Sequence, residues 1–323
     1  NHSSAEGKFR ITGLPDWRES RYVVGMERVE LSGDDIVMLL TNVPREPLSD
    51  AVMNIVKRVG DVGARVTFGG KLNAFRAVGN ISATAGDVSA DVTITKGRDD
   101  RYAVAGTART EEFNIGSLLA IGDLRNITSD VSINGSVGGG DTGGIIGDVI
   151  VGVDALDYRG YRYSAIDGRA TINGGQYYGR VTSEDENLEF DLYANVDLDS
   201  PTPAYAFSLG LERADLHALG INTRDSVSVL RANVGVDLMG EFYEDLDGYV
   251  SIADAEYQYP GAELHTDLIR LEVEGDKSQK ALTLESDFLA LEYHSHSSYR
   301  EVYEYIYNSL KTYVPLLYDN ATV

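Results

Sequence analysis

The sequence predicts an all-β protein of long antiparallel strands with a few short helices, and three observations support this fold class. Apolar and polar residues alternate along many stretches of the chain, most clearly over residues 188–198. A period of two is typical of strands that bury one face and expose the other. Short segments rich in Gly, Pro, Asp and Asn separate these stretches and have the chemistry of turns. Helical periodicity is confined to a few short segments.

Strands are predicted where the alternation is clearest. These stretches are residues 88–94, 188–198, 205–211, 232–238 and 269–273, with turns expected at 96–100, 173–175 and 199–203. Because each strand has one apolar face, the sheet must curl on itself, pack against a second sheet or leave a groove. A core filled by the protein's own side chains and an open groove for apolar ligands both fit the pattern.

Helices are expected at residues 48–59, 113–120, 214–219 and 298–313. The first is amphipathic and has Ser49 or Asp50 as its cap. The second and third are single turns. The last begins at a capping box formed by Ser298 and Glu301, and Pro315 ends it.

Similar segments recur roughly 100 residues apart, a spacing that indicates stacked structural units. The strand that begins at Tyr102 and segment 113–119 resemble the strand that begins at Tyr205 and segment 214–220. We therefore expect one repetitive segment over residues 1–323, with approximate repeat units 1–100, 101–203 and 204–323.

Composition limits the classes of function. The 323 residues include 28 Lys and Arg against 51 Asp and Glu, so the formal net charge is -23. This acidity argues against nucleic-acid binding and against adsorption to an anionic membrane surface, since both need basic clusters. The chain has no Cys, which excludes disulfides and thiolate metal sites. No apolar run is long enough for a spanning helix, so we expect any anchor to lie outside this segment.

The motifs that carry chemistry are missing from the sequence. The Gly-rich segment 138–144 lacks the Lys and Ser or Thr of a phosphate-binding loop, and is better explained as a strand connection. His294 and His296 share one face of a strand but have no evident third metal ligand. The acidic segment 241–247 lacks the register of a calcium loop. We predict no catalytic residue, no metal site and no cofactor, and expect that the protein is not an enzyme.

The order of several degenerate segments resembles the TamB/AsmA-like family of bacterial envelope proteins, in particular the large TamB-type chains of Bacteroidota. The segments are residues 111–119, 131–137, 156–163, 187–191, 214–220, 286–288 and 313–316. The resemblance implies an elongated, curled β-sheet groove, taco-like in section, in the periplasm. It also implies an inner-membrane anchor in an absent N-terminal helix, and an outer-membrane barrel partner bound through parts of the protein not present here. The family is linked to phospholipid movement between the membranes and to assembly of outer-membrane proteins, so this chain would be a middle segment.

With this resemblance, the alternating apolar residues are expected to line a groove that conducts the acyl chains of phospholipids or other lipids. The expected lining residues are Val88, Val92, Ile94, Val131, Ile133, Leu188, Phe190, Leu192, Val196, Phe207, Leu209, Val234, Val236, Ile269, Leu271, Leu282 and Leu284. One face of the C-terminal helix is expected either to gate the groove or to cap the sheet, through Tyr299, Val302, Tyr303, Ile306 and Leu310. The alternative function is a scaffold for outer-membrane protein assembly that captures client strands at its strand edges.

Overall fold

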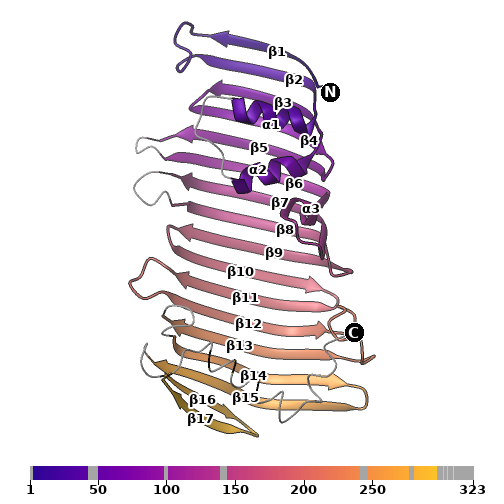
Figure 1. Cartoon of the computed structure of the whole chain (residues 1–323), viewed down its shortest axis with the longest axis vertical. Coiled ribbons are helices and arrows are strands. Elements are labelled where there is room, and N and C mark those ends of the chain that lie inside the picture. Colours follow the sequence, from indigo (N-terminus) through magenta and orange to yellow (C-terminus); the bar gives the residue numbers. More distant parts are fainter. Residues whose placement is uncertain are drawn as a thin grey trace. The chain divides into compact units, whose positions relative to one another are not determined.

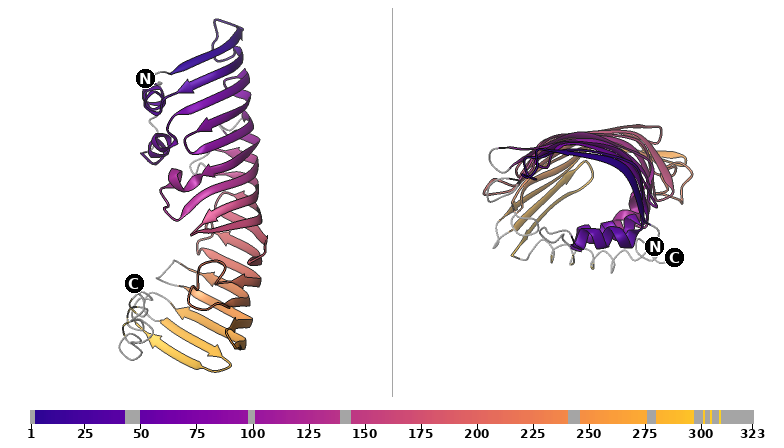
Figure 2. Two further views of the ribbon diagram at one scale, coloured as in Figure 1. Left: turned by 90° about the vertical axis from the view of Figure 1, so that its right-hand side faces the viewer. Right: turned by 90° about the horizontal axis from the view of Figure 1, so that it is seen from above.

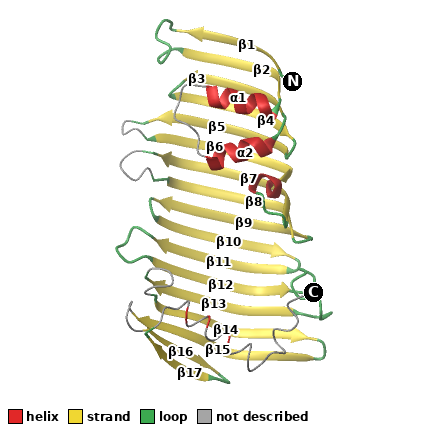
Figure 3. Ribbon diagram, in the orientation of Figure 1, coloured by secondary structure: helices red, strands yellow, loops and turns green. Residues whose placement is uncertain are grey.

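The computed structural model describes residues 3–42, 50–97, 101–138, 144–240, 246–275 and 280–296, together with Glu301, Glu304 and Asn308. Within these residues seventeen strands form one open antiparallel sheet, and three short helices are assigned (Figures 1 and 3). The predicted fold class, an all-β chain dominated by an antiparallel sheet with few short helices, is confirmed.

The chain groups into two compact units, which we describe separately. Unit 1 consists of Asn1–Gly174, Gly179–Glu189 and Ala218–Ile221, and unit 2 of Gly175–Tyr178, Phe190–His217 and Asn222–Val323. These boundaries do not coincide with the three repeat units expected from the sequence.

Unit 1 is a meander in which each strand from β1 to β9 pairs antiparallel with the next. Its strands are β1 (Ser4–Thr12), β2 (Arg21–Leu31), β3 (Val62–Lys71), β4 (Ala74–Ala83), β5 (Gly86–Lys96), β6 (Tyr102–Asn114), β7 (Leu124–Val137), β8 (Ile146–Tyr158), β9 (Tyr161–Asn173) and most of β10 (Gln176–Asp185). Helices α1 (Gly33–Asn42) and α2 (Asp50–Val59) connect β2 to β3, and α3 (Ile115–Leu119) connects β6 to β7.

Unit 2 continues the same pattern. Its strands are most of β11 (Leu188–Asp197), β12 (Ala204–Asp215), β13 (Val229–Met239), β14 (Asp247–Tyr259), β15 (Ala262–Gly275), β16 (Lys280–Ser286) and β17 (Ala290–Ser295). From β12 onward each strand pairs antiparallel with the next. The five stretches of clearest alternation fall in β5, β11, β12, β13 and β15, except that Leu198 lies one residue beyond the end of β11.

The helices match the predictions in part. The expected helices at 48–59 and 113–120 correspond to α2 and α3. The helical turn expected at 214–219 is wrong: β12 continues through Asp215 and a non-helical turn follows. There the Leu216 amide donates to the Ser228 carbonyl (2.7 Å) and the Leu216 carbonyl accepts from the Asn222 amide (2.8 Å), which closes a loop instead of a helix. Most of segment 298–313 lies outside the described residues.

Bulges interrupt the strands at similar places in the two units. The register shifts between Thr110 and Phe113 in β6, and between Leu211 and Ala214 in β12. Asp254 in β14 has no partner in the register with β15 and has a positive φ of 50°. Bulges bend a strand and increase its twist. Register shifts also occur between β1 and β2, β2 and β3, β7 and β8, and β13 and β14.

The sheet of unit 1 is curved, and the helices lie on its concave side. Figure 2 shows the strands of this unit arching, with α1 and α2 across the hollow of the arch. A capping interaction starts α1, because the Asp35 amide donates to Ser32 Oγ (3.3 Å) while Ser32 Oγ donates to the Asp35 carboxylate (2.8 Å). At α3, Asn114 Oδ1 accepts from the Ser117 amide (2.9 Å).

Candidate functional site: an apolar sheet face

The strand register of unit 1 brings apolar side chains onto one face of the sheet. Directly paired residues of neighbouring antiparallel strands share a face, as do residues two apart in one strand. One row across the unit contains Val24, Phe68, Ala77, Val92, Gly106, Ile133, Val149 and Ala170. The next row on the same face contains Met26, Val66, Gly79, Ala90, Ala108, Val131, Val151 and Gly168. We call this surface the apolar face of unit 1.

Unit 2 has an apolar face of the same kind. One complete row consists of Phe207, Val236, Val250, Leu271, Leu284 and Leu291. The rows on either side contain Leu209, Val234, Ile252 and Ile269, and Tyr205, Leu238, Gly248, Val273, Leu282 and Tyr293. No charged residue interrupts these three rows.

The opposite face of each unit carries polar and charged residues in cross-strand pairs. In unit 1 Arg76 of β4 pairs with Asp91 of β5, and Arg109 Nη1 lies 3.1 Å from Asp130 Oδ2. In unit 2 the Arg270 guanidinium lies 4.0 Å from the centroid of the Tyr249 ring. Pairs that face water contribute little stability each, but they keep the charges on the solvated side. In each unit the sheet therefore has one polar face and one apolar face.

Side chains on the apolar faces are more exposed to solvent than the side chains of a folded core. On these faces Ile133 is 43% exposed, and Phe207 and Leu271 are each 36% exposed. Among the described residues only six hydrophobic residues are buried: Ala85, Ala155, Ala214, Leu219, Ala232 and Val273. The side chains of the strands therefore do not close over one another.

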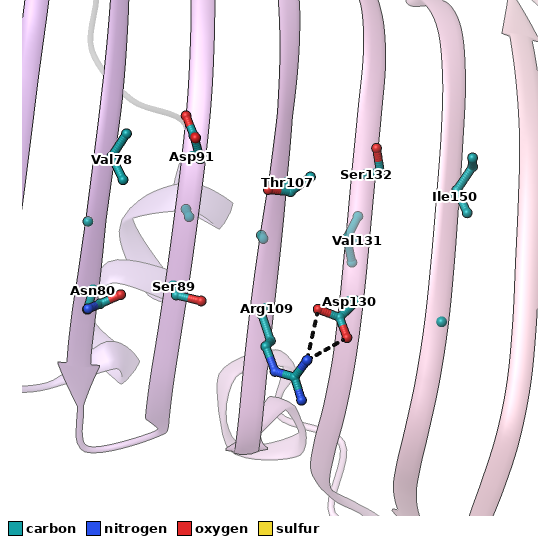
Figure 4. Close-up of a pocket in the computed structure, with 14 residues that line it drawn as sticks. Val78, Asn80, Ser89, Asp91, Thr107, Arg109, Asp130, Val131, Ser132 and Ile150 are labelled. Atoms are coloured by element: carbon teal, nitrogen blue, oxygen red, sulfur yellow. Dashed lines mark hydrogen bonds and ion pairs between the residues drawn. The ribbon is translucent and has the colours of Figure 1, made fainter.

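The helices of unit 1 lie on the same side as its apolar face. Figure 4 views the unit from its polar face, and the helices lie behind the sheet. The concave side of unit 1 is therefore the apolar one. The rings of Phe68 and Phe75 pack together on this face, with centroids 4.8 Å apart.

The structure brings the predicted lining residues together within each unit. In unit 1 the residues that share the apolar face are Val88, Val92, Ile94, Val131 and Ile133. In unit 2 they are Phe207, Leu209, Val234, Val236, Ile269, Leu271, Leu282 and Leu284. Leu188, Phe190, Leu192 and Val196 alternate along β11, and all four are half-buried. The predicted gating residues Tyr299, Val302, Tyr303, Ile306 and Leu310 lie outside the described residues.

Sequence reasoning missed several residues of the apolar faces and the helix beside one of them. Strands β3, β4, β8 and β14 were not among the clearest stretches, yet they contribute Phe68, Phe75, Val149 and Ile252. Glycines break the apolar series of these strands and hide the alternation. The capping sequence that begins at Ser32 was the available signal for α1.

Buried polar side chains hold the strand ends together at the β10–β11 turn. The hydroxyl of Tyr161 donates to Asp185 Oδ1 (2.6 Å), and the amides of Ser164 and Asn187 donate to the same carboxylate at 2.9 Å each. Burial by itself raises the pKa of Asp185, but the hydrogen bonds from Tyr161, Asn187 and Ser164 outweigh it and hold the pKa below its usual value. Burial, and then the hydrogen bond with Asp185, raise the pKa of Tyr161 to about 12. The network holds the β10–β11 turn against β9.

A shallow hollow of about 370 Å³ lies on the polar face of unit 1 (Figure 4). It is lined by residues of β4 to β8, among them Asn80, Asp91, Arg109, Asp130 and Ile150. In Figure 4 Arg109 points from β6 toward Asp130 on β7. Its charged groups are paired across strands, Asp91 with Arg76 and Arg109 with Asp130.

In the described part of the chain, no group of three or more His, Cys, Asp and Glu residues is placed to hold a metal ion. His294 Nε2 lies 2.8 Å from Glu292 Oε1 on an exposed strand face. Most of the acidic segment 241–247 lies outside the described residues. None of the helices described has both the length and the apolar character needed to cross a membrane.

Comparisons with known proteins give no match, so the proposed function depends on the geometry of the sheet. The chain matches no protein-family model, no curated protein and no solved structure.

Proposed function

We propose that this chain is a periplasmic segment of a TamB-like intermembrane protein, and that its apolar faces bind phospholipid acyl chains and conduct them between the inner and outer membranes. In this proposal other parts of the protein anchor it in the inner membrane and contact an outer-membrane barrel protein. The observation that carries the proposal is an apolar sheet face that crosses the paired strands of each unit and whose side chains stay partly exposed, Ile133 at 43% and Leu271 at 36%.

The chemistry of that face favours hydrocarbon over other ligands. Backbone N–H and C=O groups of the paired strands are engaged in the sheet, so they are not offered to a polar ligand. Side chains in the rows are aliphatic, aromatic or glycine, with no charge to orient a headgroup. Each methylene moved from water onto such a surface contributes up to about 0.8 kcal/mol. An acyl chain is the ligand that gains most from a long surface without polar groups.

The alternative function, a scaffold for outer-membrane protein assembly, draws on a different observation. All nine residues of β1 are exposed, and Phe9 in this strand is 78% exposed. An exposed strand is a template for adding a client strand. In that case the strand edges would bind client strands, and the apolar faces would only stabilise the sheet.

Two variants of unit 2 separate the proposals. Val234→Glu places a carboxylate on the apolar face, and Ser208→Glu places one on the polar face. Native mass spectrometry of the purified chain should find copurified phospholipid on the wild type and on Ser208→Glu, and much less on Val234→Glu. Absence of lipid from all three proteins, with photo-crosslinks from β1 to an unfolded barrel protein, would instead support the scaffold.

A further inference from the structure

Helices α1 and α2 are inserted between two strands that pair directly with each other. Leu31, the last residue of β2, pairs with Val62, the first residue of β3. The chain therefore leaves the sheet and returns to it at neighbouring positions, near the strand ends on the right of Figure 1. From there the helices extend across the concave side of unit 1, which carries the apolar face (Figure 2). Both connections of the two helices to the sheet thus lie at one place.

The two chain connections meet at a pair of glycines. A Cβ built on Gly33 would lie 3.3 Å from the backbone of Gly60, so the two segments are in contact. The Gly33 amide donates to Asp61 Oδ1 (3.0 Å), which ties the start of α1 to the residue before β3. Gly60 has a φ of 74°, in the left-handed region that glycine adopts without a steric penalty. Because glycine accommodates large changes of φ and ψ, this pair is suited to act as a hinge.

Polar contacts near the same strand ends hold the helices in place. The Ser3 hydroxyl donates to the Asp35 carboxylate of α1, and Ser3 Oγ accepts from the Ser32 amide (3.0 Å). Arg58 Nη1 of α2 donates to the Leu118 carbonyl of α3 (3.0 Å). All three hydrogen bonds are exposed to solvent, and water competes for each partner. Each contact therefore holds the helices only weakly.

The helices are not packed on the apolar face as the elements of a core would be. Among the side chains of α1 and α2 that the structure describes, none is buried, and Met38 of α1 is 54% exposed. Ile36 and Val37 of α1 and Met53 of α2 are half-buried. Segments with few buried apolar contacts separate from the rest of a protein at a low cost in free energy. A hinge and weak attachment are therefore combined in one insertion.

We propose that α1 and α2 form a cover over the apolar face of unit 1, and that this cover swings about Gly33 and Gly60 to admit lipid acyl chains to that face. The inference rests on the proposed function, because acyl chains are the ligand of the face. It adds a step to that function, namely how a chain reaches a face that two helices overlie. Because both connections lie at one place, the far ends of the helices, at Asn42 and Asp50, should move furthest.

Distances between spin labels measure the movement directly, because the chain has no Cys and two introduced Cys residues carry the only labels. One label is placed at Met38 of α1 and the other at Ile121 in the loop after α3, and both positions are exposed. Double electron–electron resonance is recorded on protein stripped of lipid and on protein with phosphatidylethanolamine added. Native mass spectrometry of the same samples detects bound lipid. We expect a second distance when lipid is bound.

Fixing the cover in place tests whether its movement is needed. Arg58→Cys and Leu118→Cys, joined by a short bismaleimide, fix α2 to α3. A photo-crosslinking amino acid at Val92 in unit 1 or, in a separate protein, at Leu271 in unit 2 reports lipid on each apolar face. The crosslink should abolish phosphatidylethanolamine adducts at position 92 and leave those at position 271 unchanged. The same double-Cys protein without the bismaleimide is the control for the substitutions.

A single substitution should release the cover. Arg58→Ala frees α2 from α3, so the second distance should already be populated without lipid. Lys57→Ala removes the neighbouring exposed cation of α2 and, as the matched control, should leave the distances as in the wild type.

The outcomes distinguish this inference from the proposed function. The inference alone is overturned if lipid binds at position 92 while the distance stays single, if the crosslink has no effect, or if Arg58→Ala and Lys57→Ala behave alike. Lipid at position 271 but not at position 92 of the uncrosslinked protein also overturns it. Absence of lipid from both positions overturns the proposed function and the cover together.

Discussion

Truncating Leu271 to Ala tests whether the apolar face of unit 2 is open. Leu271 lies in the middle of the row that joins Val250 to Leu284, and it is 36% exposed. The substitution removes three carbons of which about two thirds of the surface is buried, so at about 0.8 kcal/mol per methylene the lost transfer free energy is roughly 1.5 kcal/mol. An open face leaves no enclosed cavity, so no cavity term is added. In a closed core the same change costs about 2.7–5.0 kcal/mol.

Val273 of the same strand and the same face provides the comparison, because it is only 7% exposed. Val273→Ala removes two carbons from a buried site, and its transfer term is also roughly 1.5 kcal/mol. The larger truncation at Leu271 should therefore cost no more than the smaller one at Val273. Urea unfolding followed by circular dichroism measures the free energy of unfolding of each variant. A loss above about 3 kcal/mol for Leu271→Ala would mean that the face is closed, and would refute the reasoning.

Three further predictions concern the supports of the sheet. The folded-state pKa of Asp185 lies below its usual value, so the stability contributed by its ionised form is present above about pH 4 and is lost as the pH falls through the folded pKa. Asp185→Asn should therefore flatten the pH dependence of the melting temperature of unit 1 below about pH 4. An acid profile that is the same in the variant and the wild type would contradict this. Gly116→Ala should destabilise the unit by about 1–3 kcal/mol because the new methyl would overlap the Leu124 carbonyl, whereas Gly122→Ala meets no atom within 4 Å and serves as the control in thermal melts. Arg109→Ala should cost less than about 1 kcal/mol, and less still in high salt, because its partners face water; a loss above 2 kcal/mol in urea would contradict this.

Much of the fold follows from side-chain periodicity alone. Leu188, Phe190 and Leu192 alternate with charged and polar neighbours, and a strand is the only regular structure that puts them on one face. Pairing in a meander then follows from the short turns between strands. The same alternation places Val88 and Val92 on one face, because an even number of positions separates them in β5. Ile133 lies on that face because it pairs with Gly106, which in turn pairs with Val92.

The parts that were missed depend on interactions distant in sequence. The turn after Asp215 resembles a helical start, but the Leu216 amide donates to the Ser228 carbonyl and the Leu216 carbonyl accepts from the Asn222 amide, so no helix forms. Bulges such as that at Glu112, with a φ of 46°, leave no reliable pattern in a single sequence.

The central claim is that lipid acyl chains occupy the apolar face of the sheet. Ile133 and Ser132 are neighbours in β7 that lie on opposite faces, Ile133 in the row with Val92 and Val149, and Ser132 in the row with Asp91 and Thr107. A photo-crosslinking amino acid at each position, irradiated in cells and analysed for covalently bound phospholipid by mass spectrometry, compares the two faces at one level of one strand. We expect phospholipid adducts from position 133 and not from position 132. Equal adducts from both positions, or none from position 133 in a protein that folds, would contradict the proposal.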